Sequence, residues 1–170
     1  GQMRRTATQH IIAIAAYLYN KEQVTGIYMH LDIEPEPDGV IENTDEFISW
    51  YADELLDQAY TYFANTELTK DEITALIKRY ICLCYDVCHF ALEYEDHAQV
   101  LKRLEQYSIK IGKFQISSAL KIDLSENMED RLEKKEVLAQ FDEPIYLHQV
   151  IAKSCNGNLI KYRDLAEALP

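Results

Sequence analysis

The feature that most constrains the fold is the alternation of helical and extended patterns along the chain. Apolar residues recur at helical spacing over 5–23, 43–64, 70–79, 96–107 and 125–141, and extended apolar runs lie between them at 27–34, 80–86, 109–116 and 145–149. No linker or low-complexity stretch divides the chain of 170 residues. Strands that alternate with helices at this spacing favour right-handed parallel crossovers, so we predict an α/β fold in a single domain, 1–170.

Each predicted strand separates into an apolar face and a face that becomes polar at its carboxyl end, because residues two apart share a face. In the strand at 80–86, for example, Ile81, Leu83 and Tyr85 oppose Cys82, Cys84 and Asp86. A doubly wound sheet, the alternative, has two apolar faces and a glycine-rich phosphate loop, and no such loop occurs in the sequence. The pattern therefore predicts TIM-barrel-like (β/α) units, about four parallel strands with outer helices forming a partial barrel.

The polar face of these strands ends in side chains that bind metals. The four strand ends carry Glu34, Asp86, Gln115 and His148, and His89 lies three residues after Asp86. Oxygen and imidazole ligands at one barrel mouth suit a divalent metal such as Mn, Zn or Mg. Each residue also has a plainer interpretation: a cap for Asp86, a buried histidine for His148 and a solvated strand end for Glu34.

Composition excludes several classes of protein. The formal net charge is −12, with no continuous basic patch, so nucleic acid is a poor partner. No apolar stretch reaches the roughly 20 residues that span a bilayer, and no secretory signal is evident, so we expect a cytoplasmic protein without a membrane partner. Cys82, Cys84 and Cys88 are expected to be free buried thiols, because the alternative, a Cys-x-Cys-x3-Cys-His zinc site, has neither knuckle spacing nor a distal ligand pair.

Three stretches of the chain carry a resemblance to a known family. They are LDIEPEPD at 31–38, CYDVCH at 84–89 and YLHQV at 146–150. They are similar to the metabolite traffic protein EboE family, which belongs to the xylose-isomerase-like, AP endonuclease family 2 barrels. The likeness runs from about Thr25 to Leu169. A full barrel takes about 250 residues, so the chain resembles the C-terminal half of such a protein.

The resemblance implies a metal site. Carried over by position, the metal ligands are Glu34, Asp86, His89, Gln115 and His148. Two of these depart from the superfamily's pattern, because Gln115 stands where a histidine is usual and His148 where an acidic ligand is common. Half a barrel also leaves two unpaired sheet edges, so we expect self-association, with a homodimer that closes a barrel as one form.

We consider three functions for the intact protein. The first is a divalent-metal-dependent isomerase or epimerase acting on a small sugar, polyol or related metabolite, in which Glu34 or Glu36 transfers a proton and Lys113 stabilises an oxyanion. The second is phosphodiester hydrolysis of the AP endonuclease kind, although the acidic charge disfavours a DNA substrate. The third is a non-catalytic protein that binds a metabolite for other members of a pathway.

Overall fold

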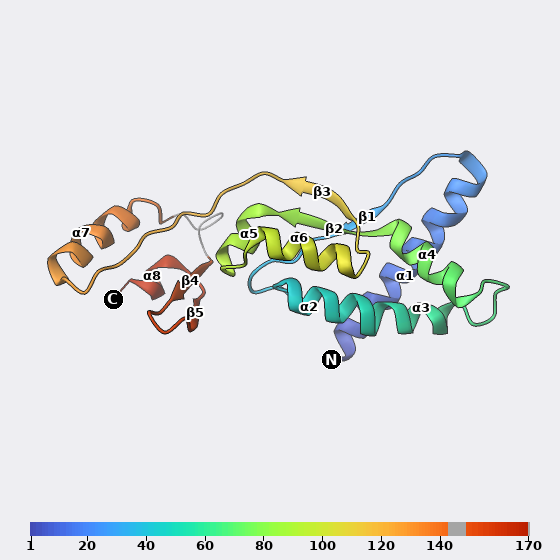
Figure 1. The fold of residues 1–170 in the computed structure, drawn as a ribbon, viewed down its shortest axis with the longest axis horizontal. Coiled ribbons are helices and arrows are strands. Elements are labelled where there is room, and N and C mark those ends of the chain that lie inside the picture. Colours follow the sequence, from blue (N-terminus) through green and yellow to red (C-terminus); the bar gives the residue numbers. More distant parts are fainter. Residues whose placement is uncertain (143–148, 170) are drawn as a thin grey trace. The chain divides into compact units, whose positions relative to one another are not determined.

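The computed structural model describes residues 1–142 and 149–169, which form two compact units, Gly1–Ser117 and Ser118–Pro170. The first unit is a mixed α/β structure and carries the predicted metal site residues other than His148, which lies outside the described residues (Figure 1). The predicted strand 145–149 also falls largely outside them.

The helices of the first unit have local sequence signals at their ends. They are α1 (Gln2–Thr25), α2 (Thr44–Ser49), the π-helix η1 (Trp50–Leu55), α3 (Leu56–Tyr62), α4 (Lys70–Tyr80), α5 (Val87–Leu92) and α6 (His97–Gln106). Gly26 ends α1 in the left-handed region, at φ 69°, which a glycine adopts without strain. Thr69 and Glu72 form a reciprocal capping box at the start of α4, and Asn43 caps α2.

A three-stranded parallel sheet forms the centre of the first unit. Its strands are β1 (Leu31–Ile33), β2 (Ile81–Asp86) and β3 (Ile111–Gln115), in the order β1-β2-β3. Asp32 pairs with Cys82, and Asp86 pairs with Gln115. Because the strands run parallel in chain order, their carboxyl ends meet at one edge of the sheet.

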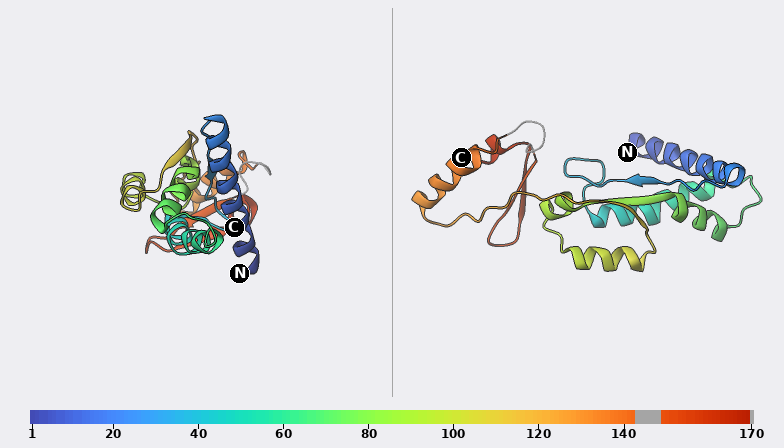
Figure 2. Two further views of the ribbon diagram at one scale, coloured as in Figure 1. Left: turned by 90° about the vertical axis from the view of Figure 1, so that its right-hand side faces the viewer. Right: turned by 90° about the horizontal axis from the view of Figure 1, so that it is seen from above.

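Helices cover one face of this sheet. Figure 1 shows the helices α2, α3 and α6 below the strands, and in the view from above in Figure 2 the strands pass in front of α2 and α3. One hydrophobic core joins Leu83 and Tyr85 of β2 to Tyr51 of η1 and Leu104 of α6. The consecutive Trp50 and Tyr51 of η1 are both buried. The Tyr51 hydroxyl donates a hydrogen bond to the backbone oxygen of Ile81, at 2.9 Å, and so ties the helix to the central strand.

The opposite face of the sheet is polar, as the strand pattern predicts. Asp32, Cys82, Cys84 and Asp86 alternate with the core residues of β1 and β2. The prediction of a partial barrel is met only in part, because the described strands form an open three-stranded parallel sheet and no closed barrel.

The second unit contains α7 (Met128–Ala139), β4 (Val150–Lys153), β5 (Leu159–Tyr162) and α8 (Leu165–Ala168). The helix α7 corresponds to the predicted helix 125–141, and the side chain of Asp164 caps α8. The antiparallel hairpin β4–β5 was not predicted, and it turns at Gly157, where φ is 84°. Among the described helices of both units, none combines the length and apolar character needed to cross a membrane.

The central position of β2 predicts the effect of a truncation there. Leu83 is fully buried, and we expect Leu83→Ala to lower the free energy of unfolding by about 2 to 5 kcal/mol through the lost contacts and the cavity left behind. Leu101→Ala is the matched control, because Leu101 on α6 is 41% exposed, and its cost should stay well below that of Leu83→Ala. Urea denaturation of both variants measures the difference, and equal costs would contradict this account of the core.

Candidate metal centre

The predicted site residues of the first unit converge at the carboxyl end of the sheet. Asp86 ends β2, and its carboxylate accepts hydrogen bonds from the Cys88 backbone nitrogen at 3.0 Å, from Ser117 Oγ at 2.5 Å and from Gln115 Nε2 at 2.9 Å. Lys113 Nζ in turn donates to Gln115 Oε1 at 3.0 Å. Asp86, Gln115 and Lys113, singled out from the sequence, therefore form one connected network on the polar face.

The Asp86 carboxylate caps a helix and still has room for a further partner. It caps α5 through the Cys88 nitrogen, which is the plainer interpretation raised by its sequence position. Burial disfavours ionisation of the carboxyl, but the hydrogen bonds from Ser117 and Cys88 outweigh burial and lower the pKa of Asp86. A carboxylate offers about four acceptor positions, so the three hydrogen bonds leave room for a further partner.

His89 on α5 lies against the loop that follows β1. Its Nδ1 is 3.2 Å from the carbonyl oxygen of Pro35 and 3.4 Å from Oε1 of Glu34. The Pro35 carbonyl can only accept, so Nδ1 carries a proton in this hydrogen bond. This arrangement, in which one ring nitrogen donates to an oxygen, is the one that orients metal-binding histidines.

Three donor atoms at this end of the sheet are grouped closely enough to bind one ion. The ligand atoms of Asp86, Cys88 and His89, which we call the carboxyl-end cluster, all lie within 4.8 Å of one another. Carboxylate, thiolate and imidazole are ligands of Zn²⁺ and related divalent metals, and three protein ligands leave a position for water or substrate. The donor set therefore fits a divalent metal.

The geometry differs from the predicted ligand set at particular residues. Glu34 contacts His89 and accepts a weak hydrogen bond from Cys84 Sγ, at 3.5 Å, so it lies beside the cluster and orients its histidine. Gln115 turns its amide nitrogen toward Asp86, and its oxygen is engaged by Lys113. Cys88 is the residue that the predicted ligand set lacks: the sequence favoured a free buried thiol there over the alternative of a Cys-x-Cys-x3-Cys-His zinc site. Its position one residue before His89 in CYDVCH was the available signal.

Glu36, a predicted proton carrier, lies in the loop after β1. Its backbone oxygen accepts from Gly39 at 3.0 Å, and its side chain is exposed. Within the part of the chain that the structure describes, no hydrogen bond or ion pair joins the Glu36 side chain to the carboxyl-end cluster. Its catalytic role thus stays a prediction from the sequence.

A second group of the same composition lies further back on the polar face. The ligand atoms of His30, Asp32 and Cys82, which we call the amino-end cluster, also lie within 4.8 Å of one another. Nδ1 of His30 is 2.7 Å from Oδ1 of Asp32. The sequence pattern gave no role to His30 or Asp32, and it indicated Cys82 as a free buried thiol.

Gly112 on β3 makes this second group possible. A Cβ at this position would overlap Oδ1 of Asp32 and Cε1 of His30, so any larger residue would push the pair away from the sheet. The register shift of β3 beside Leu83 and Cys84 accompanies this close approach.

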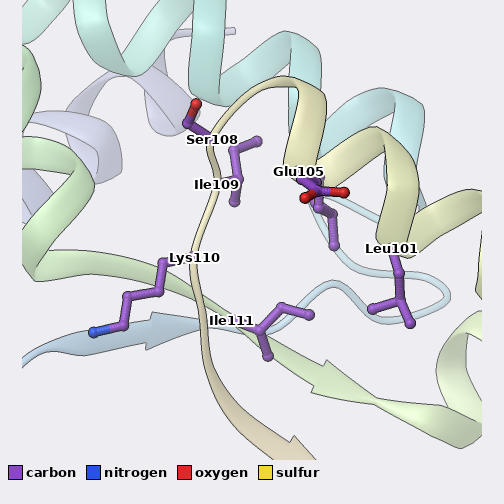
Figure 3. Close-up of a pocket in the computed structure, with 7 residues that line it drawn as sticks. Leu101, Glu105, Ser108, Ile109, Lys110 and Ile111 are labelled. Atoms are coloured by element: carbon purple, nitrogen blue, oxygen red, sulfur yellow. The ribbon is translucent and has the colours of Figure 1, made fainter.

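A shallow groove of about 480 Å³ lies elsewhere, between α6 and the start of β3 (Figure 3). It is lined by Leu101, Leu104, Glu105, Ser108, Ile109, Lys110 and Ile111. The Lys110 side chain points away from the groove, and its amine donates to the Tyr28 hydroxyl at 3.0 Å. The groove is mostly apolar and is lined by none of the predicted site residues.

Comparison with protein-family models, with curated proteins and with solved structures found no match to this chain.

The contact at Gly112 predicts a coupling between strands. We expect Gly112→Ala to lower the free energy of unfolding by about 1 to 3 kcal/mol, because the new methyl group displaces Asp32 and His30. In a His30→Ala/Asp32→Ala background the overlapping atoms are gone, so the same substitution should cost much less. Urea denaturation of the four proteins closes this cycle, and an equal cost in both backgrounds would contradict the close approach.

Proposed function

We propose that the carboxyl-end cluster binds a divalent metal and that the protein uses it to isomerise or epimerise a small sugar, polyol or related metabolite. The observation that carries the proposal is the convergence of Asp86, Cys88 and His89 within 4.8 Å at the carboxyl ends of parallel strands. The thiol of Cys88 favours Zn²⁺ over Mg²⁺, because magnesium prefers oxygen ligands.

The surrounding residues support the ligands in ways that catalysis requires. Ser117 and Gln115 hold the Asp86 carboxylate in place, and Pro35 and Glu34 orient the His89 ring. Such outer partners change metal affinity by about 10- to 100-fold when removed. The same contacts support rigid positioning, since the side chains of Asp86 and His89 are held by hydrogen bonds that do not depend on the ion.

Lys113 and Glu34 are the residues we propose for the chemistry. A bound divalent ion polarises a carbonyl or hydroxyl oxygen of the substrate. The Lys113 ammonium, which reaches the Asp86 network through Gln115, stabilises negative charge that develops on a substrate oxygen. The Glu34 carboxylate, at the end of β1 and partly exposed, accepts and returns a proton.

We also propose that the first unit forms part of a xylose-isomerase-like barrel wall, in line with the resemblance to the EboE family. Three features support this: the strands follow chain order, they run parallel, and helices cover one face alone. Strands β1 and β3 are the edges of the described sheet, which is consistent with the proposed self-association to a homodimer. The net charge of −12 weighs against the alternative of DNA phosphodiester hydrolysis.

Metal binding is the first test. We expect the protein, stripped with a chelator, to bind Zn²⁺, and His89→Ala to weaken binding at the carboxyl-end cluster by more than about 100-fold, since a ligand matters more than an outer partner. His10→Ala is the matched control, because His10 is exposed on α1. Calorimetric titration measures all three proteins. Equal Zn²⁺ binding by wild type and His89→Ala would remove the basis of the proposal.

Turnover is the second test. We expect the metal-loaded protein to interconvert an aldose and its ketose or epimer, and Lys113→Met to lower kcat by about 100-fold or more when assayed with Zn²⁺ bound. Nuclear magnetic resonance of a sugar panel in deuterated water follows both conversion and proton exchange. Sugar binding without conversion would contradict the enzymatic part and favour the non-catalytic metabolite-handling function.

A further inference from the structure

We propose that the amino-end cluster of His30, Asp32 and Cys82 is a second metal site, which binds Zn²⁺ through an imidazole, a carboxylate and a thiolate. It is separate from the carboxyl-end cluster, because Cys82 and Asp86 are four residues apart on β2. At roughly 3.3 Å per residue this places them about 13 Å apart along the strand, too far for one ion to bridge.

The spacing of the donor atoms suits this ion. A tetrahedral Zn²⁺ with bonds of about 2.0 to 2.3 Å keeps its ligand atoms about 3.3 to 3.8 Å apart. The donors of the amino-end cluster lie within 4.8 Å of one another, so side-chain adjustments of about an ångström bring them into place. Asp32 and Cys82 are paired across β1 and β2, which fixes two of the three ligands on rigid strands.

The surroundings make room for the ligands. Gly112 offers no side chain under the His30 and Asp32 pair, and the space is filled by the pair itself. The ring of His30 also packs against Tyr28, with 5.5 Å between ring centroids. His30 and Asp32 remain partly exposed, at 25% and 18% of their side-chain surface, so an ion reaches the buried Cys82 from their side.

The charges also balance. Asp32 and a Cys82 thiolate together carry two negative charges, which a divalent ion neutralises at a site where unpaired charge is costly. In the metal-free protein burial is the main cause that raises the pKa of the Cys82 thiol, to about 11, and the nearby Lys110 amine works in the opposite direction. Metal binding therefore displaces the thiol proton into solvent.

A nucleophilic cysteine assisted by His30 and Asp32 is the competing interpretation of the same three residues. A nucleophilic thiol needs access to substrate and a lowered pKa. Cys82 has 0% exposed surface, so a substrate cannot reach its sulfur, whereas a small ion can enter beside the partly exposed His30 and Asp32; the arrangement therefore favours a metal ligand over a nucleophile.

The test counts Zn²⁺ ions per chain in stripped protein, with Zn²⁺ alone as the probe. We expect two ions in wild type, one in His30→Ala, one in His89→Ala and none in the double variant, as measured by competition with a chromophoric chelator. Cys155→Ser is the matched control and should keep both ions, because Cys155 is exposed in the second unit. If wild type binds a single ion that His89→Ala abolishes and His30→Ala leaves, this inference fails while the proposed function stands.

Cobalt supplies a second readout that does not depend on counting. In a His89→Ala/Cys88→Ser background, Co²⁺ should give a near-ultraviolet thiolate-to-metal absorption band that the further substitution Cys82→Ser removes. Should Cys82→Ser fail to fold by circular dichroism, Asp32→Asn serves instead, and it should weaken Co²⁺ binding by about 10-fold or more. A band that is absent from the background, or that survives in the Cys82→Ser variant, would overturn the second site.

Discussion

The parallel register of β2 between β1 and β3 is the constraint on which the rest of the first unit depends. It sets Asp32 beside Cys82 and Asp86 beside Gln115, and it brings the carboxyl ends of the three strands to one edge. The helices pack on one face only, so alternate residues of β2 enter either the core or the polar face. A slip of one residue would exchange the two sets and abolish both the core and the clusters.

Both metal-binding clusters follow from this alternation. Each combines one aspartate, one histidine and one cysteine, and each uses β2 for at least one ligand. In each, a histidine Nδ1 faces an oxygen: the Pro35 carbonyl for His89 and the Asp32 carboxylate for His30. The polar face thus holds its ligands by hydrogen bonds that exist without an ion.

The tertiary fold also corrected several local expectations. The strand expected over 27–34 is confined to Leu31–Ile33, because Ile27 and Met29 remain exposed and have no core to enter. The helix α5 directly after β2 was not expected, since its six residues are too few to show a periodic pattern.

The sequence by itself determined the α/β alternation, the faces of β2 and the proximity of Asp86 and His89, because strand parity and a spacing of three residues are local properties. Only the tertiary structure decided that Cys88 joins them, that Glu34 meets His89, and that His30 and Asp32 lie over Gly112. The contacts of Glu34 with His89 and of Asp32 with Gly112 join segments about 50 to 80 residues apart, and packing between strands and helices brings those segments together. The position of the Cys88 thiol depends on the direction in which its side chain turns, which the local sequence pattern does not give.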